Sequence, residues 1–165
     1  MYLYNKIIYK IIGSLLCIFI IFNSSLHADT LTSLQKAAHE KQQHHHAKSN
    51  YYYFETLSKQ PNNTEALYGL AHSYQHLRKN DKALIELKKL LQINPAHEQG
   101  LMLSALINIQ SQNWNQVLNN AEQVIQINPL NEQAYMYLDS AYSALGDTAA
   151  AASAMDRYQQ VKAQQ

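Results

Sequence analysis

The sequence has a single cysteine among 165 residues, and this residue, Cys17, lies inside an apolar run near the N-terminus. The rest of the chain can form neither a disulfide nor a cysteine-based metal site, so packing alone must stabilise it. An excess of charge of one sign is also missing, because 13 Lys and Arg residues nearly balance 12 Asp and Glu residues. With no basic stripe and no acidic tail, the composition argues against a nucleic-acid partner.

Glycine and proline are scarce, with four and three residues respectively, while 47% of the chain is hydrophobic. This composition is typical of a folded helical protein and argues against a disordered one. Motifs for catalysis are absent as well. The sequence shows no glycine-rich phosphate loop, no serine in a nucleophile elbow and no spacing that pairs a general acid with a base. We therefore predict a non-enzymatic protein without a cofactor.

The first 28 residues have the composition of a secretory signal. Lys6 and Lys10 precede an apolar run over residues 11–22, and the small residue Ala28 comes before a polar segment. A basic start, a short apolar core and a small residue at the cut are the features of such signals. We expect residues 1–28 to direct export across the inner membrane to the periplasm, with cleavage after Ala28.

An uncleaved membrane anchor is the alternative interpretation of this region. The apolar run is shorter than the roughly 20 residues of a membrane span. Counting back to Ile7 lengthens it to residues 7–22, and we expect any membrane contact through those residues alone. Leu16 precedes Cys17, where a lipoprotein signal requires a small residue, so we expect no lipid attachment.

An internal repeat organises the remainder of the chain. The three prolines, Pro61, Pro95 and Pro129, are each 34 residues from the next. Further sets keep the same spacing: Leu67, Leu101 and Tyr135; Ala83, Val117 and Ala151; Leu87, Ala121 and Met155; Ile93, Ile127 and Val161. Unrelated helices would not hold one register over so many positions, so we predict repeated units.

Each unit has the pattern of two helices joined by a polar turn. In the first full unit, apolar residues at i, i+3, i+4 and i+7 form one helical stripe: Leu67, Leu70, Ala71 and Tyr74. A polar turn follows, in which we expect Asn80 or Asp81 to cap the second helix. The stripe of that second helix comprises Ala83, Leu84, Leu87, Leu90 and Leu91. We expect Pro95 to end it, because the residue before a proline is disfavoured in a helix.

These units resemble the tetratricopeptide repeat family. The family places a large residue, then leucine with a small residue, then tyrosine on the first helix, as in Leu67, Leu70–Ala71 and Tyr74. Three full units match: residues 64–97, 98–131 and 132–165, with residues 29–63 as a degenerate N-terminal unit that contains a histidine-rich turn. The middle unit departs most, with Ser104, Asn108 and Val117 where the pattern has Leu, Tyr and Ala. The resemblance implies an all-α fold, a right-handed superhelical array of antiparallel helix pairs.

The resemblance also implies a concave groove, lined by the first helix of each pair, that holds an extended peptide or a partner helix. Its positions carry aromatic, thioether and amide side chains: Tyr68, His72, Gln75, His76, Met102, Leu106, Gln110, Gln133, Met136 and Ser140. Methionine and tyrosine adapt to varied apolar partners. The alternative for Met102, Leu106 and Met136 is that they pack in the core.

Some members of the family grip a terminal carboxylate with basic residues. The matching positions here carry no fixed positive charge: Tyr68, His72, Leu103, Gln133 and Tyr137. We therefore expect no recognition led by an acidic tail.

A histidine tract, His44 to His46, with His39 nearby, raises the question of a metal site. Consecutive helical residues point about 100° apart, so the three rings of the tract cannot share one helix face. Only Glu40 offers a nearby carboxylate. We expect a polar turn without metal ligands, and a tract that gains charge below about pH 6.5.

The densest aromatic run covers residues 51–54. Four consecutive aromatic residues cover all sides of a helix, so we expect Tyr53 and Phe54 to pack inward while Tyr51 and Tyr52 face water. The alternative is a docking patch for a partner or a membrane surface. The last helix, from Thr148 to about residue 163, carries a run of alanines that another helix could approach, which leaves self-association open.

Together these features predict a non-enzymatic scaffold or adaptor of the cell envelope that binds a segment of another protein in its groove. Two alternatives stay open at this point. One is a self-associating structural subunit of an envelope assembly, and the other is a histidine-dependent metal-binding protein.

Overall fold

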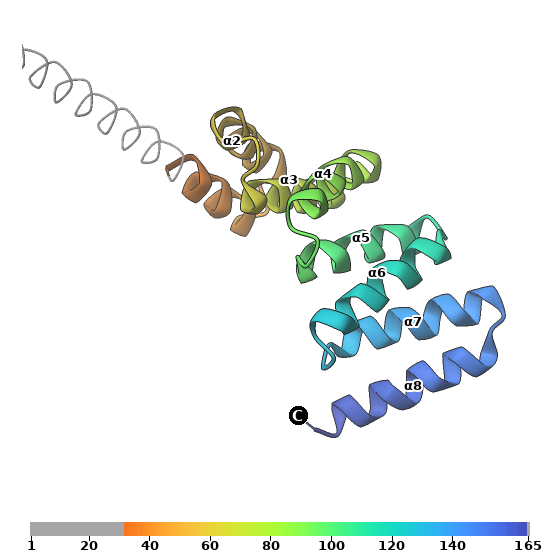
Figure 1. The fold of residues 1–165 in the computed structure, drawn as a ribbon. Helices are drawn as coiled ribbons and strands as arrows, with labels where there is room; N and C mark the ends of the chain where they lie inside the picture. Colours follow the sequence, from red (N-terminus) through yellow and green to blue (C-terminus); the bar gives the residue numbers. More distant parts are fainter. Residues whose placement is uncertain (1–31, 165) are drawn as a thin grey trace, which may run out of the picture.

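The computed structural model describes residues 32–164, and this range contains helices and turns without a strand. A helix over residues 32–42 is followed by α2 (His46–Lys59), α3 (Thr64–His76), α4 (Asn80–Ile93), α5 (Glu98–Gln110), α6 (Trp114–Ile127), α7 (Glu132–Leu145) and α8 (Thr148–Lys162). Each helix packs beside the next one along the chain, and the helix pairs stack in one direction (Figure 1). The all-α solenoid predicted from the repeat is confirmed.

Residues 1–31 lie outside the described part of the chain, so the signal or anchor expected in residues 1–28 stays a prediction. Within the described residues, no helix is long and apolar enough to cross a membrane.

The first helix of each pair begins at a capped position that repeats every 34 residues. Asn63 and Asn131 accept a hydrogen bond through the side-chain oxygen from the backbone N–H of the third residue that follows. His97 does the same through Nδ1, at 3.0 Å from the Gly100 nitrogen. Such caps satisfy N–H groups that have no partner inside the helix. The proline two residues before each cap separates the helix from the preceding one.

The turn inside each pair contains one residue with left-handed backbone geometry. These residues are also 34 positions apart: His44 (φ 58°), Arg78 (φ 57°), Gln112 (φ 57°) and Gly146 (φ 82°). Only glycine adopts this conformation without a steric cost. The turn before α4 also corrects one expectation: neither Asn80 nor Asp81 caps the helix, since Lys79 occupies that position without a side-chain bond. Asn80 is already helical, and its amide donates to Gln110 Oε1 at 3.0 Å.

This geometry yields a first prediction, on the four left-handed turn residues. Replacing Gly146 by alanine should lower the free energy of unfolding by about 1 kcal/mol, because a Cβ strains a positive φ. Replacing Gln112 by glycine should instead raise the free energy of unfolding, because glycine removes the steric cost of the positive φ. This gain should be smaller than the loss in Gly146→Ala, since glycine also gives the unfolded chain more conformational freedom. Urea unfolding of the two variants measures both effects, and equal signs would contradict the steric explanation.

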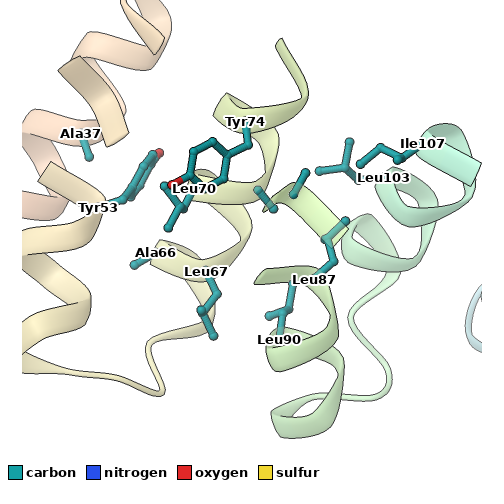
Figure 2. Close-up of a cluster of buried hydrophobic side chains, with 12 residues drawn as sticks. Ala37, Tyr53, Ala66, Leu67, Leu70, Tyr74, Leu87, Leu90, Leu103 and Ile107 are labelled. Carbon is teal, nitrogen blue, oxygen red and sulfur yellow. The ribbon is translucent and has the colours of Figure 1, made fainter. Parts of the chain in front are cut away.

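The hydrophobic core runs through the interfaces between neighbouring helices. One cluster extends from Ala37 in the helix over residues 32–42 through α2, α3 and α4 to Ile107 on α5 (Figure 2). Ala71 and Ala83, both fully buried, let α3 and α4 approach closely, and the larger Tyr74 and Leu87 fill the space beside them. A second cluster joins α6, α7 and α8.

The middle unit replaces part of this apolar packing with a buried polar network. The Asn120 amide donates to Ser104 Oγ at 2.8 Å, and the Asn108 amide donates to the Ser104 carbonyl at 2.8 Å. The Gln116 amide in turn donates to Asn120 Oδ1 at 3.0 Å. The two residues that depart from the family pattern at positions 104 and 108 therefore bond to each other. Their polar groups are buried, and each has a hydrogen-bond partner.

The aromatic run on α2 differs in part from the expectation. Tyr53 is buried and Tyr51 is 65% exposed, as the helical pattern predicts. Phe54, however, is 49% exposed, and only an edge of its ring faces Tyr74, with ring centroids 6.4 Å apart. The prediction that Phe54 packs inward is wrong: the neighbouring Tyr53 ring is the one that packs on α3, beside Gly69.

Candidate functional groove

A groove of about 480 Å³ opens along the first helices of the three full pairs, α3, α5 and α7. The structure brings seven of the predicted groove residues to its walls: Tyr68, His72, Gln75, His76, Met102, Leu106 and Gln133. Met102 and Leu106 are half-buried, so their apolar surface is partly available to a partner. These residues share one surface because the repeat places every first helix on the same side of the stack.

Three predicted residues lie outside this groove. Gln110 lines a neighbouring polar pocket of about 420 Å³ together with Arg78 and Asn80. Met136 is 47% exposed on α7, and Ser140 Oγ donates to the Met136 carbonyl at 2.9 Å. Further lining residues come from the beginnings of α5 and α7 and were not predicted as groove residues: Glu98, Gln99, Leu103, Asn131 and Tyr137. Leu103 and Tyr137 had been considered only as positions that grip a carboxylate, while Glu98, Gln99 and Asn131 lie at or before the first residues of α5 and α7.

The acidic group of the groove is fixed by its neighbours. Glu98 Oε1 accepts hydrogen bonds from the Asn128 amide at 2.9 Å and from the Asn131 amide at 2.7 Å. Burial raises the pKa of the Tyr68 and Tyr137 phenols, so both stay neutral. The remaining walls are imidazole, amide, thioether and aliphatic. The groove therefore suits a segment with apolar and hydrogen-bonding side chains.

A series of rings extends outward from the N-terminal end of the groove, which Tyr68, His72 and His76 line. We call this series the histidine row: His44, His46, His76, His72, Tyr68 and His97. The His46 and His76 rings are stacked, with centroids 4.4 Å apart and planes at 4°. The His72 and His76 rings, one turn apart on α3, have centroids 4.6 Å apart. The row joins groups from α2, α3 and the cap of α5, so sequence neighbours alone did not reveal it.

Two imidazoles of the row are held in the neutral form. Burial, followed by repulsion from Lys41, His76 and His46, lowers the pKa of His72 to about 4. Burial, followed by the charges of His76, His44 and Lys41, also lowers the pKa of His46. The Nδ1 atoms of His46 and His72 are buried without a hydrogen-bond partner, so a proton at either atom would lack an acceptor.

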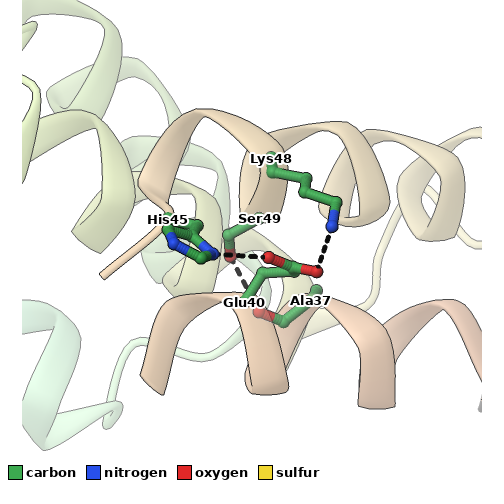
Figure 3. Close-up of polar contacts among 5 residues, drawn as sticks. All are labelled: Ala37, Glu40, His45, Lys48 and Ser49. Atoms are coloured by element: carbon green, nitrogen blue, oxygen red, sulfur yellow. Dashed lines mark hydrogen bonds and ion pairs between the residues drawn. The ribbon is translucent and has the colours of Figure 1, made fainter. Parts of the chain in front are cut away.

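The third histidine of the tract, His45, has a different setting. Its Nδ1 lies 3.0 Å from Glu40 Oε2, while Lys48 Nζ lies 2.6 Å from Glu40 Oε1 (Figure 3). The Ser49 hydroxyl donates to the Ala37 carbonyl at 2.8 Å between the same two helices. The Lys48 ammonium holds the pKa of Glu40 below its usual range, with His45 contributing in the same direction. These contacts fasten the helix over residues 32–42 to α2.

The described residues do not bring together three or more His, Cys, Asp or Glu side chains that could hold a metal ion. The three consecutive histidines have different settings: His44 lies in a left-handed turn, His45 contacts Glu40, and His46 stacks on His76.

Solved structures share this architecture. MamA is similar with a TM-score of 0.76 and 19% identity, over 81% of this chain and 73% of that one. A tetratricopeptide repeat protein from Parabacteroides merdae gives a TM-score of 0.71 and 20% identity, over 78% of this chain and 50% of that one. The first tetratricopeptide repeat domain of Spaghetti (RPAP3), bound to an HSP90 peptide, gives 0.68 and 18%, over 71% of this chain and 93% of the domain.

No protein-family model matches the sequence, and no curated protein matches it either. At these low identities, the likeness to solved structures establishes the fold alone. That fold is the tetratricopeptide repeat fold, in agreement with the resemblance seen in the sequence.

Proposed function

We propose that this chain is a non-enzymatic scaffold that binds a segment of a partner protein in the groove formed by α3, α5 and α7. The observation that carries the proposal is the groove itself, in which half-buried Met102 and Leu106 lie among amide and aromatic groups. Exposed thioether and aromatic surface is well suited to a partner's apolar side chains. The similar domain of Spaghetti (RPAP3), which was solved with a peptide bound, supports a peptide as the ligand class.

We further propose that the protein acts in the cell envelope, on the basis of the basic and apolar composition of residues 1–28. Mass spectrometry of the protein from its native cells tests this. A mature chain that begins at Asp29 supports export with cleavage, while an intact N-terminus in the membrane fraction supports the anchor. An intact chain in the cytoplasmic fraction would contradict both.

The binding proposal predicts that shortening two groove side chains removes partner capture. In the full-length protein, the double variant Tyr68→Ala and Met102→Ala should weaken binding at least about tenfold, since central aromatic and thioether contacts often contribute more than 1 kcal/mol each. Cross-linked partners from the native cells, quantified by mass spectrometry, provide the measurement. Met155→Ala on α8 is the matched control, because this methionine lies outside the groove. Equal capture by all three proteins would refute the groove assignment.

A further inference from the structure

We infer that the histidine row is a proton-operated latch, which holds α2 against α3 while its rings are neutral and releases α2 when His46 and His76 both take up protons. The latch concerns the free protein. Its consequence for partner binding rests on the function proposed above, because His72 and His76 belong to both the row and the groove.

The geometry places this latch between two helix pairs. His46 is the first residue of α2, and His76 is the last residue of α3, yet their rings stack at 4.4 Å with nearly parallel planes. Near the middle of the same interface, Tyr53 packs against Gly69. The stacked imidazoles thus make the contact between α2 and α3 at the end where the groove begins, and that contact consists of two groups that can become charged.

The surroundings of the row carry cations and no free carboxylate. The groups that face His46 and His72 are Lys41 from the helix over residues 32–42, His44 from the turn, and His76 from α3. The same Lys41 ammonium lies 5.9 Å from the centre of the Tyr68 ring. Glu40 is engaged by Lys48 and His45, and Glu98 is engaged by two asparagines. The neighbours that act on His46 and His72 are all cationic or able to become so, and protons on the row would therefore repel one another.

Stacking of this kind is stable only while at least one ring of each touching pair is neutral. Two imidazolium rings 4.4 Å apart would face each other as like charges. The buried, unpartnered Nδ1 atoms of His46 and His72 add a second penalty, because a proton there has no acceptor. The lowered pKa of both groups agrees with this geometry. Acid should therefore separate the rings and free the start of α2, which changes the wall formed by His72 and His76.

Hydrogen exchange of the full-length protein, analysed by mass spectrometry and corrected for intrinsic rates, tests the latch without any partner. Between about pH 7.5 and about pH 5.5, protection of the α2 amides should fall at least about tenfold relative to α7, since histidine titrates in this range. His76→Phe keeps a ring for stacking but cannot take up a proton, so its α2 protection should fall much less than that of the wild type, with only the burial of His46 and His72 left to respond to acid. His39→Gln replaces an exposed histidine outside the row and should respond like the wild type.

Constant α2 protection in the wild-type protein would overturn the latch, and so would an equal fall in His76→Phe. If His76→Phe does not fold, as judged by its helical circular dichroism, the double variant His46→Gln and His76→Gln takes its place and should also lose most of the response. These outcomes are independent of partner capture. A failed groove experiment leaves the latch standing, and a failed exchange experiment leaves the groove standing.

Discussion

Replacing Gly69 by alanine should lower the free energy of unfolding by about 3 kcal/mol, at the upper end of the range for overpacking a core. A Cβ at this position would overlap the Tyr53 ring at Cε1, Cζ and the hydroxyl. The ring cannot retreat easily, because it is 3% exposed and belongs to the cluster between α2 and α3. The added methyl group must therefore push the two helices apart.

Urea unfolding measures this loss, and two further variants isolate its cause. Gly100→Ala is the control, since its Cβ would meet the flexible end of Leu90, at 2.8 Å from Cδ2, and more loosely His97 Nδ1, at 3.2 Å, and should cost less. Tyr53→Leu shortens the opposing side chain, so combining it with Gly69→Ala should be less damaging than the sum of the single changes. Strict additivity of the two substitutions would show that Tyr53 is not what excludes a side chain from position 69.

The helices and the core were predictable because their signals are local and repeat. The stripe of the first full unit, Leu67, Leu70, Ala71 and Tyr74, follows the helical period, and all four residues are buried. A 34-residue period then assigns the same roles to the later units without further information. Gly69 shows the limit of this reasoning. Its place in the helix was clear, but the ring that excludes a side chain there comes from a different helix pair.

The candidate site was less predictable for the same reason. Seven groove residues followed from their positions on first helices, but the histidine row depends on how α2 and α3 pack across the boundary between two units. The i, i+4 spacing of His72 and His76 was visible in the sequence. That His46 stacks on His76 was not visible, since helical periodicity gives the faces of one helix and not the alignment of two. The expectation that Asn80 caps α4 was wrong for a similar reason. The left-handed residue Arg78 in the preceding turn sets where α4 begins.

Acid should destabilise the wild-type chain more than its His72→Gln variant. Burial and the nearby cations lower the pKa of His72 from 6.5 to about 4 in the folded state. Between these two values, the unfolded chain binds a proton at His72 that the folded chain does not, so the free energy of unfolding falls as the pH falls. The contribution is absent above about pH 6.5 and reaches its full size, about 3 kcal/mol at most, below about pH 4.

Urea unfolding at about pH 7.5 and at about pH 4.5 gives the loss of stability on acidification for each protein, which cancels any effect of the substitution at neutral pH. The wild-type loss should exceed that of His72→Gln by about 2 kcal/mol, since most of the interval between the two pKa values has been crossed. His39→Gln, an exposed control outside the row, should lose as much as the wild type. An equal loss in His72→Gln and in the wild type would show that the His72 ring is not a source of acid sensitivity. Any acid response of the histidine row would then have to come from the repulsion between His46 and His76 alone.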